Sequence, residues 1–290
     1  MRLSRFAHFA LALPLFCLLA ASASADAPKS GETDRTVTRT GPHGTSRTST
    51  NHSTWQRGGG HWTRNTVHTG PAGKQSTTHV DGSKTADGAV RDVTRTGPNG
   101  KTSTTQDVVH KTDGGFTRDT THTGPNGGVT TRDVTGSYDK NSKTLTKDVT
   151  TTHPNGTTST TQVQEQRTAD GFTKTSTHTG PNGGVTTRDV TESYDKDSKS
   201  WTKDVTTTGP NGKTSTTQVE GQKTGNGYTR EATHTGPNGG VTTSQGQGTW
   251  DPATKTWTRD RVVTHPNGST SSTEVTKTVT PVTPEPPAAQ

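Results

Sequence analysis

A turn-forming tetrapeptide recurs along this chain and restricts its fold more than any other feature. It has the form G/H-P-x-G and starts at Gly41, Gly70, Gly97, Gly124, His153, Gly180, Gly209, Gly236 and His265, at intervals of 27 or 29 residues. Proline fixes φ at an early turn position and glycine takes positive φ freely, so each tetrapeptide predicts a turn. Regular repetition at this period is typical of a protein built from one supersecondary unit.

A second turn lies midway between successive tetrapeptides and has two forms. The short form contains D-G or N-G, as in Asp170-Gly171, and suits a two-residue hairpin loop. The long form runs from Tyr138 to Leu145 and recurs as Tyr194 to Trp201 and Trp250 to Trp257. An aromatic residue opens each long form, and a large apolar residue closes it seven positions later. The spacing predicts hairpins closed by cross-strand apolar pairs.

The stretches between turns are rich in threonine and valine, which favour strands. We therefore predict an all-β fold: a repetitive antiparallel meander of about 18 short strands, as a single-layer or coiled sheet with disordered termini. Nine units of 27–29 residues would fill residues 33–279. Only 20% of the residues are hydrophobic, so this chain cannot bury a thick core. A passive, disordered or extended threonine-rich spacer stays open as an alternative.

Both ends of the chain differ from the repeats. Residues 1–25 combine Arg2 and Arg5 with an apolar run and an Ala23-Ser24-Ala25 cleavage pattern, which predicts a secretory signal peptide. Its removal would lower the formal net charge from +7 to +5 and take away the single cysteine. We expect a flexible segment over 26–32, a proline-rich tail over 280–290, and no transmembrane segment in the mature chain. The location would be periplasmic, cell-surface or extracellular.

Strand alternation separates the charges onto two faces. If Tyr138 pairs with Leu145, then Val134 pairs with Val149, and the basic residues share their face with the aromatic ones. The acids, such as Asp133 and Asp148, fall on the opposite face with threonine. This arrangement predicts a basic, aromatic face that could bind a polyanion, and we assign to it the residues Arg118, Arg132, Tyr138, Lys147, Lys174, Arg188, Tyr194, Trp201, Lys203 and Arg230. In the alternative interpretation, the aromatic pairs serve only to stabilise the hairpins.

Catalytic chemistry has no support in this pattern. Nearly every histidine, aspartate and serine occupies a repeated position, whereas an active site needs unique residues that converge in a pocket. His68, His122, His178 and His234 each precede T-G-P on equivalent strand ends and read as polar residues beside turns. We expect no enzyme activity, no cofactor and no metal site.

The segment from Pro125-Asn126-Gly127 through Tyr138-Asp139 to Pro154-Asn155-Gly156 resembles the YD repeats of bacterial Rhs-type proteins. Those repeats alternate a tyrosine–aspartate hairpin with a P-x-G turn, and the resemblance covers about three of the nine units. It departs from the family where Lys-Asn-Ser-Lys follows the YD pair instead of glycine. The resemblance implies a sheet of hairpin repeats and no activity.

Together these features favour an exported structural or interaction protein of the bacterial envelope or extracellular matrix. Such a protein would bind an anionic polysaccharide or other polyanion by multivalency, or associate with itself through unprotected edge strands. The T-x-T runs also raise ice binding as an alternative, although charged residues on both faces count against it.

Overall fold

A computed structural model describes residues 29–41, 44 and 46–280. The predicted signal peptide and all but the first residue of the predicted tail lie outside this range. The described part consists of strands joined by turns, and it contains no helix long and apolar enough to cross a membrane. The strands are β1 (Lys29–Thr40), β2 (Ser46–Gly58), β3 (His61–Thr69), β4 (Gln75–Lys84), β5 (Gly88–Thr96), β6 (Thr102–Thr112), β7 (Gly115–Thr123), β8 (Val129–Asp139), β9 (Thr144–Thr152), β10 (Thr158–Arg167), β11 (Gly171–Thr179), β12 (Val185–Asp195), β13 (Ser200–Thr208), β14 (Thr214–Lys223), β15 (Gly227–Thr235), β16 (Val241–Asp251), β17 (Thr256–Thr264) and β18 (Thr270–Thr280).

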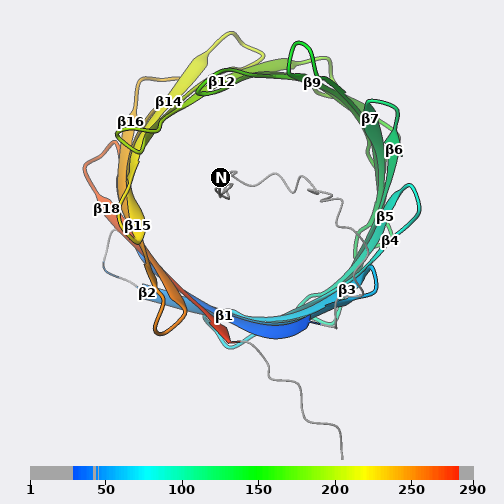
Figure 1. The fold of residues 1–290 in the computed structure, drawn as a ribbon, viewed down its shortest axis with the longest axis horizontal. Helices are drawn as coiled ribbons and strands as arrows, with labels where there is room; N and C mark the ends of the chain where they lie inside the picture. Colours follow the sequence, from blue (N-terminus) through cyan, green and yellow to red (C-terminus); the bar gives the residue numbers. More distant parts are fainter. Residues whose placement is uncertain (1–28, 42–43, 45, 281–290) are drawn as a thin grey trace, which may run out of the picture.

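The strands close into a barrel. Each strand pairs antiparallel with its neighbours in sequence, and β1 also pairs with β18, from Glu32 opposite Thr280 to Thr40 opposite Ser272. Figure 1 shows the resulting ring, viewed along its axis. Strands about 4.8 Å apart and tilted by about 40° would give an 18-stranded tube about 35 Å across. The expectation of an open or coiled sheet with two unprotected edges is therefore wrong, although the strand number and antiparallel order are confirmed.

The predicted P-x-G turns are present. The backbone N–H of Gly100 donates to the carbonyl oxygen of Gly97 at 3.0 Å, and the same bond recurs in the other tetrapeptides. The last glycine of each has positive φ, for example 76° at Gly100 and 82° at Gly127. Glycine is needed at this position because other residues pay a steric penalty in the left-handed region.

The short turns form as expected, and in the turn between β10 and β11 the glycine serves another purpose than positive φ. In the turn between β10 and β11, the N–H of Thr168 donates to the carbonyl oxygen of Gly171 at 3.0 Å. Gly171 is absent from the positive-φ residues; instead, a Cβ there would overlap the backbone carbonyl of Glu192 on β12. The glycine thus permits a close approach between neighbouring strands, which a substitution with any side chain would disturb.

The long turns hold a lysine in the left-handed region. Lys143, Lys199 and Lys255 have φ of 55°, 56° and 52°. An aspartate at the end of the preceding strand organises each turn: Asp195 accepts hydrogen bonds from the N–H of Asp197 and from the hydroxyl of Ser198, both at 2.8 Å. The side-chain bonds stabilise a backbone conformation that lysine adopts only at a cost.

The wall is a single layer, and its few buried apolar side chains lie on one side of it. Val37, Val134, Val149, Val190 and Val219 are each no more than 5% exposed. The register pairs Val134 with Val149, as predicted, and Tyr138 with Leu145. Hydrogen bonding around the closed ring, together with these valines under long basic side chains, replaces a thick core.

Candidate functional site: the lumen of the barrel

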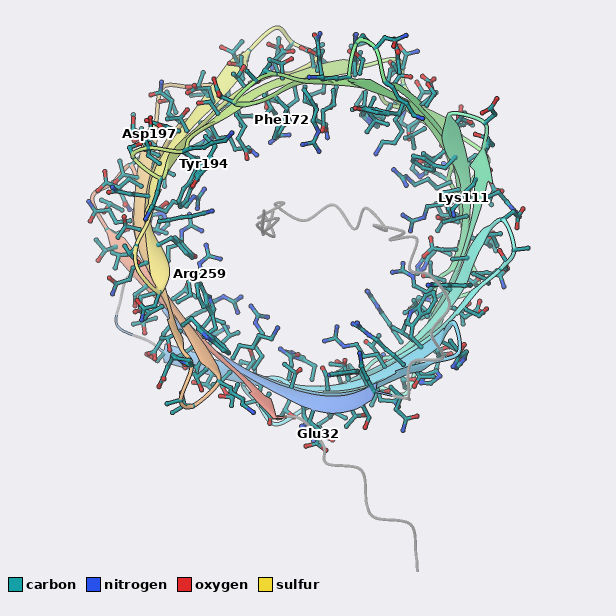
Figure 2. The ribbon with its side chains drawn as sticks, in the orientation of Figure 1. Glu32, Lys111, Phe172, Tyr194, Asp197 and Arg259 are labelled. Atoms are coloured by element: carbon teal, nitrogen blue, oxygen red, sulfur yellow. The ribbon has the colours of Figure 1, made fainter. Side chains whose placement is uncertain are left out.

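Side chains alternate between the lumen and the outer wall, and the register decides which goes where. Figure 2 shows Phe172, Tyr194 and Arg259 on the lumen side and Glu32 on the outer side. Directly paired residues project to the same side of a sheet. The strand pairings therefore extend the assignment around the whole ring without a break.

Every lysine and arginine of the strands faces the lumen. They are Lys29, Arg35, Arg39, Arg47, Arg57, Arg64, Lys84, Arg91, Arg95, Lys111, Arg118, Arg132, Lys147, Arg167, Lys174, Arg188, Lys203, Lys223, Arg230, Arg259, Arg261 and Lys277. Within the strands, the acids on this side are only Asp107, Glu165 and Glu192. The lumen wall therefore has a large excess of positive charge, and its nitrogen atoms point inward in Figure 2.

The outer wall has the opposite character. Its strand positions are dominated by threonine, and its carboxylates are those of Glu32, Asp34, Asp81, Asp92, Asp119, Asp133, Asp139, Asp148, Asp189, Asp195, Asp204, Glu220, Glu231, Asp251, Asp260 and Glu274. Valine is the largest apolar residue that the described strands place on this side. The outer wall is thus acidic and polar, and the described strands carry no aromatic residue on it.

The aromatic side chains gather on the lumen side near one mouth, the end that carries the long and short turns. Several rings lie beneath cations: Lys203 Nζ is 5.9 Å from the centroid of Phe172, and Lys223 Nζ is 4.9 Å from that of Tyr194. Trp201, Tyr228 and Trp257 instead contact one another. Aromatic and basic groups therefore line the same mouth.

The predicted site residues share one face, as their alternation requires, and this face is the lumen wall. Arg118, Arg132, Tyr138, Lys147, Lys174, Arg188, Tyr194, Trp201, Lys203 and Arg230 all project inward by the register. The sequence analysis placed them on the exposed face of a single-layer or coiled sheet. Closure of the ring instead brings strands from opposite halves of the chain to face one another across a shared interior.

The sequence analysis did not identify a buried carboxylate on the lumen wall and the cluster of basic and hydroxyl groups around it. Asp107 on β6 is 2% exposed and accepts hydrogen bonds from Arg91 Nε at 2.9 Å, Arg118 Nε at 3.0 Å and Thr120 Oγ1 at 2.7 Å. Equivalent positions on β10 and β14 hold Val163 and Val219. Aligning the repeats against one another would have exposed this substitution. The cluster neutralises part of the lumen charge on one sector of the wall.

Four histidines line the other mouth. His122, His178 and His234 place Nδ1 within 2.8–2.9 Å of the hydroxyl of Thr105, Thr161 and Thr217, on the strand that precedes each. His68 Nδ1 lies 2.7 Å from the amide oxygen Oδ1 of Asn51, also on the preceding strand. These contacts are those of polar residues beside turns, as the sequence analysis interpreted the four histidines. The described residues contain no group of three or more histidine, cysteine or acidic side chains that could hold a metal ion.

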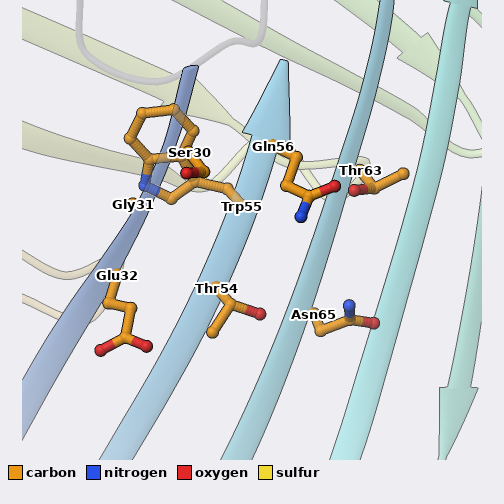
Figure 3. A pocket seen from close by; sticks show the side chains of 8 residues that line it. All are labelled: Ser30, Gly31, Glu32, Thr54, Trp55, Gln56, Thr63 and Asn65. Atoms are coloured by element: carbon orange, nitrogen blue, oxygen red, sulfur yellow. The ribbon is translucent and has the colours of Figure 1, made fainter. Parts of the chain in front are cut away.

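Grooves on the wall are shallow and open. One, of about 290 Å³, is lined by Ser30, Glu32, Thr54, Gln56, Thr63 and Asn65 on the outer wall, with Gly31 and Trp55 beside them. Figure 3 shows this groove; the ring of Trp55 lies against the position of Gly31 on the neighbouring strand. Its lining is polar and lacks a cluster of catalytic type, so the lumen is the better candidate site.

Comparisons with known proteins place the fold among porins. No family model and no curated protein matches the sequence. Among solved structures, the chain is similar to the outer membrane protein OpdK of Pseudomonas aeruginosa, at 8% identity and a TM-score of 0.61, covering 88% of this chain and 99% of that one. OccK11 and OccK3 of the same bacterium give TM-scores of 0.59 and 0.58, at 8% and 6% identity. They cover 88% of this chain and 96% and 95% of their own. At such low identity the likeness defines the fold, an 18-stranded porin-type barrel.

This result corrects the functional prediction. The sequence predicted a structural or interaction protein of the envelope or matrix that binds polyanions on an open face. This prediction is wrong, because that face encloses a lumen. Self-association through free edges is wrong because β1 and β18 pair with each other. The spacer and ice-binding alternatives also fail, since the described chain is regular strand and its threonine rows curve around a ring. The prediction that the mature chain has no transmembrane segment is no longer supported, because OpdK, which has a similar fold, is an outer membrane protein.

Proposed function

We propose that this protein is a channel rather than an enzyme, and that its lumen passes anionic solutes. The observation that carries the proposal is the segregation of charge: the basic residues of the strands all face the lumen. Barrels of 16–18 strands leave an aqueous passage, since their side chains cannot fill it. Basic rings lining a pore favour anions over cations, because the local potential concentrates the opposite charge. We place the channel in the bacterial outer envelope, as for the similar OpdK structure.

The outer wall sets a condition on this proposal. Barrels that span a membrane present an outward apolar band about 25 Å tall, flanked by aromatic girdles. Here the described outer wall carries threonine and carboxylates and no aromatic residue. Each carboxylate held against hydrocarbon would be unfavourable. Insertion into a bilayer is therefore the most demanding requirement of the proposal, and the experiment measures insertion as well as selectivity.

The test is conductance across a planar lipid bilayer under a potassium chloride gradient. We expect discrete channels whose reversal potential shows that chloride permeates more readily than potassium. Protein recovered from vesicles after flotation would report insertion independently. Failure to insert or to conduct would overturn the channel proposal, and a preference for potassium would overturn the role of the basic lumen.

Adjacent residues on opposite faces provide matched variants. Arg188 faces the lumen and Asp189, its neighbour in sequence, faces outward; Lys203 and Asp204 repeat this arrangement. Replacing Arg188 and Lys203 with Gln should lower the chloride-to-potassium permeability ratio. Replacing Asp189 and Asp204 with Asn changes an equal amount of charge outside the lumen and should leave the ratio nearly unchanged. Equal effects of the two pairs would show that the selectivity does not arise in the lumen.

A further inference from the structure

Three aromatic side chains form a continuous strip on the lumen wall. Trp201 on β13, Tyr228 on β15 and Trp257 on β17 contact one another, with ring centroids 6.1 Å apart for the first pair and 6.0 Å for the second. The first contact is edge-on at 65°, and the second is stacked at 25°. We call these three residues the aromatic strip.

Glycines on the intervening strands let the rings of the strip approach the backbone of the wall closely. The ring of Trp201 occupies the space that a Cβ of Gly221 on β14 would take, and the rings of Tyr228 and Trp257 do the same over Gly248 on β16. Each ring therefore rests against backbone on one side. All three side chains are only half-buried, which leaves apolar ring surface turned to the lumen.

Other aromatic rings at the same mouth lie beneath cations. Lys203 lies over Phe172, Lys223 over Tyr194, and Arg57 over Trp55. Within the described residues, no cation occupies a ring face of the aromatic strip. Exposed aromatic faces in a polar lumen are surfaces on which another flat ring can stack.

Basic groups without acidic partners stand beside the strip. None of their cross-strand neighbours is acidic: these are Gly248 and Val275 for Arg259, Gly246 and Thr273 for Arg261, and Gly221 and Gly246 for Arg230. The lumen face of β13–β18 carries no carboxylate in the described residues. Guanidinium groups donate to carboxylate, sulfonate or phosphate oxygens in a fixed fork geometry.

From this juxtaposition we infer that the aromatic strip and Arg230, Arg259 and Arg261 form a binding site for small anions that carry a planar ring. The ring stacks on the strip while the anionic group pairs with the guanidinium groups. This inference rests on the proposed function, since the ligand must first enter the lumen. It goes beyond anion selectivity, because it makes the ring, and not charge alone, a determinant of binding.

Equilibrium dialysis of the full-length protein separates these contributions with three probes: naphthalene-2-sulfonate, methanesulfonate and naphthylmethylammonium. We expect naphthalene-2-sulfonate to bind about tenfold more tightly than methanesulfonate, the size expected for one ring stacked on aromatic side chains. The ammonium probe should bind more weakly than either anion. Equal binding of the two sulfonates would overturn the site while leaving anion selectivity intact. A preference for the ammonium probe would overturn both this inference and the basic-lumen proposal.

Variants locate the site. Tyr228→Leu keeps an apolar cover over Gly248 but removes the ring, so it should abolish most of the preference for naphthalene-2-sulfonate. Phe116 on β7 covers Gly136 in the same manner on a distant part of the wall, and Phe116→Leu is the matched control. Arg259→Gln should weaken binding of this probe, whereas Arg95→Gln on β5 should not. If the control variants lower binding as much as the strip variants, the ligand does not bind at the strip.

Discussion

Asp119 on β7 lies directly opposite Asp133 on β8, so two exposed carboxylates face each other across a strand pair of the outer wall. Like charges in this position are destabilising by roughly 0.2–1 kcal/mol. Asp119→Asn should therefore raise the urea midpoint of unfolding at low salt, with a smaller gain at high salt because the repulsion is screened. Asp148→Asn is the control, since Asp148 is paired with Thr135 and Gln162. A larger gain in the control would show that the pairing is not responsible.

A glycine in the short turn provides a test of strand approach. Gly171→Ala places a Cβ where the carbonyl of Glu192 lies, and the strands must separate to admit it. We expect a loss of stability of about 1–3 kcal/mol, as for overpacked sites, measured by urea unfolding. Gly225 lies in the equivalent turn before β15 with open space around its Cβ position. Gly225→Ala should be nearly neutral, and a comparable loss there would mean that turn flexibility, not the contact, sets the cost.

Local sequence patterns predict the strands, turns and faces of this fold well, because each is decided by neighbouring residues. The pairing of Tyr138 with Leu145 follows from turn length and alternation, and it is confirmed. Closure could not be predicted in this way. It depends on β1 meeting β18, two segments at opposite ends of the repeat whose sequences carry no mutual signal. The same side-chain pattern is compatible with an open sheet, so the inner and outer sides were indistinguishable.

The candidate site was predictable to the same extent. Alternation alone puts Arg188 and Lys203 with the aromatic residues and away from Asp189, and the register confirms this. What alternation cannot supply is the contact between strands that lie two apart. The approach of Trp201 to Tyr228 depends on Gly221 between them, where an absent side chain is the determining feature.

The buried carboxylate of Asp107 gives a prediction about both stability and selectivity. Arg91 and Arg118 are partly exposed, with side chains 28% and 23% accessible, so they can turn to lumen water if Asp107 is removed. Asp107→Val restores the residue type of β10 and β14 and should cost little stability. It should also raise the chloride-to-potassium permeability ratio, because a lumen carboxylate is lost.

Removing the arginines instead of the aspartate should cause a larger loss of stability. Replacing Arg91 and Arg118 together with Gln leaves Asp107 buried without a cationic partner, a change that typically costs about 3–5 kcal/mol. Urea unfolding of the two variants compares them directly. If Asp107→Val is the more destabilising of the two, the ion pairs of Asp107 contribute net stability, and the expectation that its removal costs little is wrong.

The long turn predicts a pH dependence with a defined sign. Asp195 lies at the end of β12, and its carboxylate accepts hydrogen bonds from Ser198 Oγ and from the backbone N–H groups of Asp197 and Ser198. The hydroxyl of Ser198, with the two N–H groups, lowers the pKa of Asp195 below its ordinary value. A depressed pKa in the folded state contributes stability above the unfolded pKa of about 3.9, and this contribution disappears as the pH falls through the folded value. Asp195→Ala should therefore lower the unfolding midpoint at about pH 7 and have a much smaller effect near about pH 2, where the carboxyl is protonated in both states. Asp170→Ala, in a short turn, is the control at another turn aspartate. An effect of Asp195→Ala that is equal at the two pH values would mean that the turn depends on the shape of the aspartate and not on its charge.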